Sequence, residues 1–473
     1  MLLKHTFIYA LAKIIPGLMA FAALSLYTHF LTPSEYGIYT LIFTGAVFLH
    51  NVIFNWLPAG TLRFWSNETY DQKTFTSTLA ISYFKISLLL LGVALAGAIY
   101  YWNQSEAMWI ISAYALLMGL ALYTITQSLL AARIEPTQYA YLTISYSILA
   151  LALGTLFAYL GYGATGVVVG IALGISAPAI ILIKKLWLPF DKKVYSKDLF
   201  KQLLVYGLPL ASAALLEELT KVSDRFMLAW LQGKDQAGYY AVGYDLSGNS
   251  ILLIMSALNL AAYPVIIKLL DKEGMKPAMA YFHKYVILLL GISIPAVVGL
   301  NLVGPDLVYL LIDEKYQDSV VFLLPWITSA VFMMGLQAFY FDLAFQLGHY
   351  VIAIVKISIV VAIVNIGLNY WLIPTMGLQG AAIATLSSFS LGSVLSAILG
   401  IKRFTLPFPL KEFLKIVLAT AVMGFCLWWL KDLRGWGWLI LQLGAGIVSY
   451  FIMIVVFNVM GIQAEIKERM GRS

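Results

Sequence analysis

Ionisable side chains inside long apolar stretches are the residues of this sequence that could do chemistry. The densest set lies in one such stretch. Glu217, Lys221 and Arg225 follow one another at intervals of four residues, so they share one face of a helix. Glu218 and Asp224 each lie three residues from Lys221. A charge at the bilayer centre costs about 3 kcal/mol or more, so this face must meet a partner helix or a polar cavity. The set is either a ladder of ion pairs or a group of ion-coupling sites.

Three lysines form a second set of candidates. Lys13, Lys85 and Lys356 each lie about six to ten residues inside the expected cytoplasmic boundary of an apolar stretch, roughly 10 to 15 Å of helix. A lysine binds phosphate as a flexible point charge, so these three and Lys221 could form a cationic cavity for a pyrophosphate. Alternatively, each side chain extends to the membrane surface or pairs with an acid. Arg63 either joins this cavity or marks the interface.

Two further acids and two prolines complete the candidates. Asp245 and Asp342 could bind H⁺ or Na⁺ for coupling or gating, because ionisable groups inside membrane helices are costly without a role. Asp342 lies only about one turn from the cytoplasmic boundary, so simple solvation is its alternative. Pro16 and Pro209 interrupt the first apolar stretch of each half of the chain, and we expect a helix bend at both.

These residues lie within fourteen apolar stretches that fill the 473-residue chain almost from end to end. A membrane-crossing helix needs roughly 20 apolar residues. A composition of 61% hydrophobic and 11% charged residues is that of an integral membrane protein. The sequence therefore predicts an all-α membrane protein with fourteen transmembrane helices. Their expected spans are 6–31, 35–62, 75–101, 107–131, 138–160, 164–188, 202–231, 236–267, 278–303, 319–346, 350–373, 377–401, 412–431 and 436–460.

The basic residues are distributed unevenly along these spans. The net charge is +7, and most of the 30 Lys and Arg fall on the same side as the N-terminus. The positive-inside rule places this side and both termini in the cytoplasm. The basic excess is thus a topology signal, helped by membrane lipids, and we expect no nucleic-acid partner. The opposite side holds Lys234, Lys315, Lys431 and Arg434.

The two halves of the chain echo each other. Segment 37–39, Gly-Ile-Tyr, recurs as Gly-Tyr-Tyr at 238–240, and Gly-Ala-Thr-Gly at 163–166 matches Gly-Leu-Gln-Gly at 377–380. Six spans separate the copies, so both have the same orientation and a pseudo-twofold axis runs along the membrane normal. Small residues at four-residue spacing then favour close helix packing. They are Gly166, Gly170 and Gly174 in one copy and Gly380, Ala384, Ser388 and Gly392 in the other.

This repeat defines the expected domains. They are an N-lobe of helices 1–6 at 1–188, a cytoplasmic linker at 189–201, a C-lobe of helices 7–12 at 202–403, and two extra helices with a cytoplasmic tail at 404–473.

Other motifs argue against an enzyme. The segment 161–166 matches the dinucleotide fingerprint GxGxxG, but it lies between two membrane spans and not between a strand and a helix. The sequence has no Walker A pattern, no metal-binding Cys or His spacing and no convincing nucleophile constellation. Its one cysteine, Cys426, cannot form an intrachain disulfide. We expect no enzymatic activity, no cofactor and no metal.

Three segments resemble a known family. They are Thr-His-Phe-Leu-Thr-Pro-Ser-Glu-Tyr-Gly-Ile-Tyr at 28–39, Tyr-Gly-Leu-Pro at 206–209 and Ser-Asp-Arg-Phe-Met-Leu at 223–228. They resemble the Wzx-type polysaccharide-biosynthesis flippases of the multidrug/oligosaccharidyl-lipid/polysaccharide (MOP) exporter superfamily. The resemblance implies a MATE-like fold of two six-helix lobes plus two C-terminal helices, with a cationic central cavity and alternating access.

The resemblance also implies a function. Such a protein translocates undecaprenyl-pyrophosphate-linked oligosaccharides of O-antigen, capsule or exopolysaccharide across the bacterial inner membrane, and it could contact a polysaccharide polymerase and chain-length machinery. We expect coupling to an H⁺ or Na⁺ gradient. Three alternatives remain open: a cation-coupled multidrug antiporter of the same fold, a lipid II flippase, and a non-transporting scaffold of a polysaccharide assembly complex. The lysines favour an anionic substrate over a drug.

Overall fold

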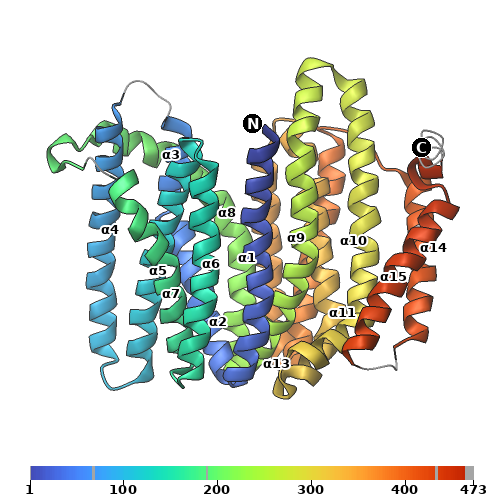
Figure 1. The fold of residues 1–473 in the computed structure, drawn as a ribbon, viewed down its shortest axis with the longest axis horizontal. Helices are drawn as coiled ribbons and strands as arrows, with labels where there is room; N and C mark the ends of the chain where they lie inside the picture. Colours follow the sequence, from blue (N-terminus) through green and yellow to red (C-terminus); the bar gives the residue numbers. More distant parts are fainter. Residues whose placement is uncertain (1, 66–69, 188–189, 432–434, 464–473) are drawn as a thin grey trace. The chain divides into compact units, whose positions relative to one another are not determined.

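The computed structural model describes residues 2–65, 70–187, 190–431 and 435–463; the side chains of 2–10, 184, 209–217 and 221 lie outside the described part. Across these residues the regular structure is helical, and no strand occurs among them (Figure 1). This confirms the predicted all-α class. In lipid, an α-helix satisfies every backbone hydrogen bond within one segment, which is why such apolar stretches fold this way.

The chain divides into two compact units, Met1–Gly238 and Tyr239–Ser473. In the first, α1 packs on α6, α5 on α7, and α8 on α2, α3 and α4. Helix α1 continues through Pro16, and the predicted bends at Pro16 and Pro209 stay predictions. The elements up to the end of α8 are α1 (Leu2–Phe30), α2 (Pro33–Ile53), α3 (Trp56–Phe64), α4 (Gln72–Tyr100), α5 (Ser105–Ala132), α6 (Pro136–Tyr159), α7 (Gly163–Leu186), η1 (Lys192–Val194) and α8 (Lys197–Leu231).

The second unit contains most of α9 and the rest of the chain. Its last two helices pack on each other and on α10 (Figure 1). A domain boundary at the linker 189–201 rests on the sequence repeat and stays a prediction. The elements are α9 (Lys234–Lys272), α10 (Met275–Leu311), α11 (Glu314–Leu336), the π-helical η2 (Gln337–Phe341), α12 (Leu343–Leu347), α13 (Ile352–Ile401), α14 (Leu410–Trp429), α15 (Trp436–Val456) and η3 (Val459–Gly461).

Each of the fourteen predicted spans corresponds to a helical segment of the structure. Eleven helices of the described residues are long and apolar enough to cross a membrane. One of them, α13, turns at Gly377, where φ is 56° and ψ is −129°, and so supplies two predicted spans. The spans 202–231 and 412–431 correspond to α8 and α14, which are not among these eleven. The span 35–62 is divided between α2 and α3.

The start of α2 lies in segment 28–39, one of the three segments that resemble the flippase family, and its residues form a helix cap. The side-chain oxygen of Thr32 accepts a hydrogen bond from the backbone N–H of Glu35 at 3.3 Å, and the Glu35 carboxylate accepts one from the backbone N–H of Thr32 at 2.8 Å. Pro33 occupies the start of the helix, where its missing N–H is not needed. This capping box satisfies backbone donors that the helix itself cannot satisfy, so the helix begins sharply.

Small residues bring helix pairs into backbone contact, as predicted. A β-carbon at Gly174 would lie 2.3 Å from the backbone nitrogen of Ala150, so α6 and α7 touch through their backbones. A β-carbon at Gly380 would lie 2.4 Å from the carbonyl oxygen of Leu372, across the turn of α13. A larger residue at either position would push the paired helices apart.

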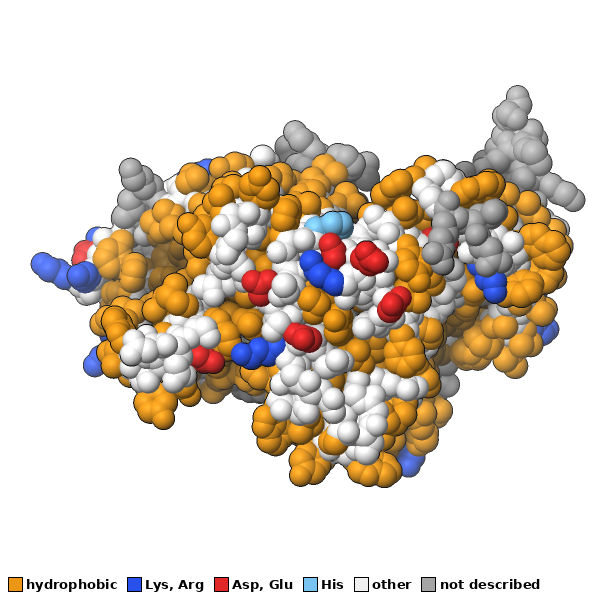
Figure 2. All heavy atoms as spheres, turned by 90° about the horizontal axis from the view of Figure 1, so that it is seen from below, with side chains coloured by type: hydrophobic (Ala, Val, Ile, Leu, Met, Phe, Trp, Pro, Cys, Tyr) orange, Lys and Arg blue, Asp and Glu red, His pale blue; other side chains and the backbone are white. Residues whose placement is uncertain are grey.

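Large apolar side chains cover the outside of the helices. On α4, Phe84, Leu88 and Leu89 are 61%, 71% and 70% exposed. Soluble proteins rarely expose contiguous apolar patches of this kind. Figure 2 shows hydrophobic side chains over much of another face, with acidic and basic side chains among them. The protein is a multi-pass membrane protein.

Candidate functional site

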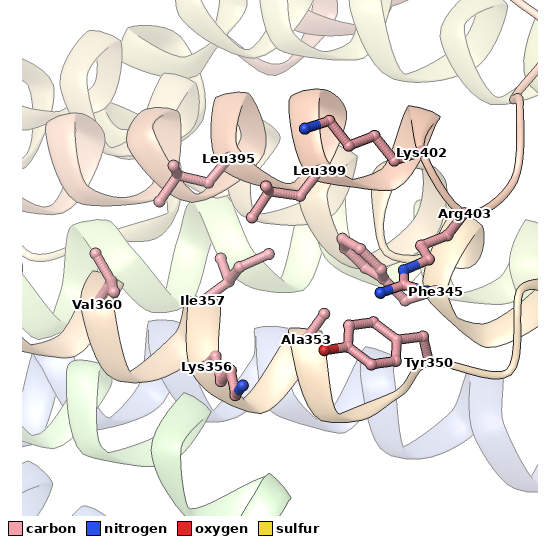
Figure 3. Close-up of a pocket in the computed structure, with 10 residues that line it drawn as sticks. All are labelled: Phe345, Tyr350, Ala353, Lys356, Ile357, Val360, Leu395, Leu399, Lys402 and Arg403. Atoms are coloured by element: carbon pink, nitrogen blue, oxygen red, sulfur yellow. The ribbon is translucent and has the colours of Figure 1, made fainter.

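A groove in the second unit brings Lys356 together with other basic side chains. It has a volume of about 410 Å³, and its walls come from α12, the turn after it and both halves of α13 (Figure 3). None of the described residues that line it is acidic. They are Phe345, Tyr350, Ala353, Lys356, Ile357, Val360, Leu395, Leu399, Lys402 and Arg403.

Lys356, Lys402 and Arg403 are the charged residues of this groove, with Lys356 on one half of α13 and the other two at the end of the other half (Figure 3). The guanidinium carbon of Arg403 lies 3.9 Å from the ring centroid of Tyr350, a cation–π contact that orients the guanidinium. Lys356 and Lys402 are exposed, so their ammonium groups can move. A planar donor group beside two mobile cations suits a phosphate or diphosphate ligand.

A tight turn positions Arg403 in the groove. A β-carbon at Gly348 would lie 2.7 Å from the carbonyl oxygen of Ala344 and 3.1 Å from the Cβ of Arg403, so any larger residue would clash. His349 follows with φ of 54°, in the left-handed region, and the chain then enters α13 through Tyr350.

Most of the remaining wall of the groove is apolar. Leu395 and Leu399 on one half of α13 face Ile357 and Val360 on the other half (Figure 3). Val360 and Leu399 are 40% and 42% exposed, so the apolar wall is open to the surroundings. A hydrocarbon chain can therefore lie along this wall while its phosphate meets the basic end of the groove.

Asp342 is buried close to the end of this region. It is 5% exposed and accepts a hydrogen bond from Ser396 Oγ at 2.6 Å. It follows a π-helical turn, in which its backbone N–H donates to the carbonyl oxygen of Gln337 at 2.8 Å. Such turns are frequent at functional sites. The carboxylate is thus held inside the protein, in contrast to the solvated alternative considered from the sequence.

Lys85 lies in a separate cleft, in the first unit. The cleft has a volume of about 650 Å³ and is formed by α4 and the segment 190–195. Lys85 Nζ lies 4.4 Å from the ring centroid of Tyr195. Helix side chains tilt toward the helix N-terminus, so Lys85 reaches toward the end of α4 where the linker lies. This geometry agrees with a lysine that extends to the membrane surface.

Two of the other cationic candidates, Lys13 and Arg63, are not among the residues that line these two pockets. Lys13 on α1 and Arg63 on α3 are exposed. Lys221 and Glu217 belong to α8, but their side chains lie outside the described part of the chain, as does that of Pro209. A single cavity shared by the predicted lysines stays a prediction.

The charged residues toward the end of α8 are buried. Arg225 donates a hydrogen bond from Nη1 to Thr40 Oγ1 of α2, and the neighbouring Asp224 is 1% exposed. This contact links two helices of the first unit, which agrees with a structural role. Glu218 and Asp245 are partly buried. An ion-coupling role for these residues stays a prediction.

Comparison with known proteins identifies the family. A sequence profile described as "Polysaccharide biosynthesis protein" matches residues 2–270. The chain belongs to this polysaccharide biosynthesis protein family. A curated relative described as "Probable flippase AglR", from Haloferax volcanii, is 29% identical over 184 residues. That match covers 37% of this chain and 36% of AglR, so it spans about a third of the relative's length.

Solved structures show the fold of this family member. The structure titled "Lipid II flippase MurJ, inward closed conformation" matches with a TM-score of 0.79 at 16% identity, over 96% of this chain and 100% of MurJ. An inward-facing multidrug resistance MATE transporter of the MOP superfamily matches with a TM-score of 0.62 at 15% identity, over 83% of this chain and 97% of that one. The chain therefore has the MATE-like fold predicted from its sequence.

Sequence analysis missed Lys402, Arg403 and Tyr350. The basic pair follows the twelfth apolar stretch, where it was interpreted only as a topology signal. If two antiparallel helices turn at Gly377, residues at equal sequence distances before and after this glycine lie opposite each other. Lys356 then lies opposite position 398, about one helical turn from Lys402 and Arg403. The sequence therefore predicts that Lys356 lies near this basic pair only if a turn between two antiparallel helices is assumed at Gly377.

Proposed function

We propose that this protein is a flippase for lipid-linked oligosaccharides. It would move undecaprenyl-pyrophosphate-linked units of O-antigen, capsule or exopolysaccharide from the cytoplasmic to the outer leaflet of the bacterial inner membrane, by alternating access, with both termini in the cytoplasm. The observation that carries this proposal is the groove of Lys356, Lys402 and Arg403, whose basic end adjoins an apolar wall. Membership of the polysaccharide biosynthesis family supports the same substrate class.

The groove has the two properties that such a substrate requires. A diphosphate cannot enter hydrocarbon without its water shell unless other groups replace that shell. Lys356, Lys402 and Arg403 would supply positive charge and N–H donors, while the prenyl chain would lie along Leu395 and Leu399. The groove would therefore collect substrate from one leaflet.

The energy source that we propose is the H⁺ or Na⁺ gradient together with the membrane potential. The potential contributes about 2.3 kcal/mol per charge per 100 mV. The candidates for a change of protonation or ion occupancy are the acids Glu217, Glu218, Asp224, Asp245 and Asp342. Arg225 keeps its charge and is a candidate for gating only. If jumps in pH and in Na⁺ across proteoliposomes leave the flipping rate unchanged, this coupling does not operate.

Reconstitution tests the function directly. The protein would be placed in proteoliposomes with a fluorescent polyprenyl-diphosphate oligosaccharide, and a membrane-impermeant reductant would report how much label reaches each leaflet. We expect faster exchange than in protein-free vesicles, and more exchange than with the same polyprenyl chain lacking the diphosphate. Equal rates with and without protein would contradict a flippase and leave the scaffold alternative. Exchange of lipid II in place of the oligosaccharide would identify a lipid II flippase. Export of a cationic drug instead would identify a multidrug antiporter.

A further inference from the structure

The linker between α7 and α8 is attached to the side of α4. Lys73 Nζ lies 3.0 Å from Asp191 Oδ2, and the backbone N–H of Asp191 donates to Ser77 Oγ at 3.0 Å. One turn further along the linker, the backbone N–H of Ser196 donates to Thr78 Oγ1 at 3.1 Å. The segment 190–196 is therefore a part of the first unit with a defined position, and it closes one side of the Lys85 cleft.

The cleft so formed is lined by basic and by apolar side chains. Lys85 and Lys192 are its charged residues, and none of the described residues that line it is acidic. The remaining lining residues are Ile81, Phe84, Phe190 and Tyr195. Phe84 is 61% exposed, and the lipid-facing stripe continues with Leu88 at 71%. A hydrocarbon chain that begins in the cleft can therefore follow the surface of α4.

Asp191, the acid next to Lys192 in the sequence, is held by other groups. Its carboxylate is already engaged by Lys73 and by the backbone N–H of Lys193 at 2.9 Å. The aromatic ring of Tyr195 orients the Lys85 ammonium without neutralising it. Both ammonium groups remain exposed and able to meet an anion.

The geometry points to a binding site for the phosphate group of an anionic lipid. Lys85 and Lys192 contact the phosphate, and one acyl chain packs on Ile81, Phe84 and Leu88. The lipid connects α4 to the linker, so its binding stabilises the attachment of the segment that leads into α8. This site is independent of the flippase proposal, and it gives Lys85 a role other than the substrate contact considered from the sequence.

Lipid binding to the purified full-length protein tests this site. Native mass spectrometry of delipidated protein would count the bound molecules of short-chain phosphatidylglycerol, short-chain phosphatidylcholine and inorganic phosphate in separate titrations. A Lys near a charged membrane surface contributes about 1 kcal/mol, which corresponds to about fivefold in affinity. We expect Lys192→Ala to weaken phosphatidylglycerol binding about fivefold. The double variant that combines Lys85→Ala with Lys192→Ala should weaken it about 25-fold.

The neighbouring residue Lys193 provides the matched control. It is exposed and carries the same charge, but it does not line the cleft, so Lys193→Ala should change binding less than twofold. Phe84→Ala should weaken phosphatidylglycerol binding and leave phosphate binding unchanged. Equal losses for Lys192→Ala and Lys193→Ala would show only general surface charge and overturn the site. Inorganic phosphate that binds as tightly as phosphatidylglycerol would overturn the lipid assignment.

A second measurement reports the linker itself. Hydrogen exchange of the segment 190–196 should slow in the presence of phosphatidylglycerol vesicles and remain unchanged with phosphatidylcholine vesicles. Because Lys192 lies in a short exposed 3-10 turn, Lys192→Ala leaves the helices intact and still removes this protection. Protection that persists in Lys192→Ala would contradict the proposal.

Discussion

Gly37 of α2 and Gly238 of α9 lie against the backbone of each other's helix. A β-carbon at Gly37 would lie 2.0 Å from the carbonyl oxygen of Lys234, and one at Gly238 would lie 2.2 Å from the carbonyl oxygen of Pro33. These glycines occupy matching positions of the sequence repeat, in segments 37–39 and 238–240. The starts of these two helices therefore touch through their backbones within the first unit.

This contact predicts that replacing either glycine with alanine lowers the stability of the protein. Gly→Ala inside a helix normally stabilises by up to about 1 kcal/mol, because alanine has the higher helix propensity. Gly37→Ala and Gly238→Ala should instead destabilise by about 1 to 3 kcal/mol, since each added methyl group meets backbone. The measurement is the melting temperature in detergent. The control is Gly92→Ala in α4, where nothing lies within 4 Å of the added carbon; equal behaviour of all three variants would refute the contact.

The hydrogen bond between Ser396 and Asp342 predicts a coupled pair. Ser396→Ala removes a donor from a buried carboxylate, and the loss of a hydrogen bond to a charged group costs about 1.5 to 3 kcal/mol. We expect a lower melting temperature for Ser396→Ala, and a smaller additional loss when Asp342→Asn is already present. Ser329→Ala, which removes an exposed hydroxyl of α11, is the control. Fully additive losses in the double variant would mean that the two side chains do not interact.

The attachment of the linker to α4 should depend on pH only in strong acid. The backbone N–H of Lys193 and the Lys73 ammonium hold the pKa of Asp191 below its ordinary value of about 3.9. A lowered folded-state pKa contributes stability that is present above the ordinary value and is lost as the pH falls through the lower one. Hydrogen exchange of the segment 190–196 should therefore be faster in Asp191→Asn than in wild type at pH 7. The two should converge only once the pH has fallen through the lowered pKa of Asp191, and a difference that persisted with the carboxyl protonated would contradict this assignment.

The groove predicts which basic residues matter for flipping. Removing one charge from a phosphate contact costs on the order of 1.4 kcal/mol, or tenfold in affinity. Lys356→Ala and Lys402→Ala should each lower the flipping rate at subsaturating substrate about tenfold. Arg403→Lys keeps the charge but loses the planar contact with Tyr350, so it should also lower the rate. Lys411→Ala removes an exposed charge of α14 outside the groove and should have little effect; a similar loss there would indicate a general charge effect.

The approximate positions of the membrane-crossing segments could be predicted from the sequence because the bilayer sets their length and their helical form. A span requires a fixed length of apolar residues, and lipid leaves backbone groups no partner except their own helix. The segments 163–166 and 377–380 were interpreted from the sequence only as matching parts of a repeat, and the structure shows that the chain turns at the first glycine of each. Gly163 and Gly377 both have positive φ, as a tight turn between antiparallel helices requires.

The partners of the charged side chains could be decided only by the tertiary structure. Lys85 and Lys356 look alike in the sequence, each a lysine inside an apolar stretch, yet one contacts the linker at Tyr195 and the other lines a groove with Arg403. The reason is physical: hydropathy specifies that a segment is a helix, but contacts between side chains depend on how each helix is rotated and on which neighbour it packs against.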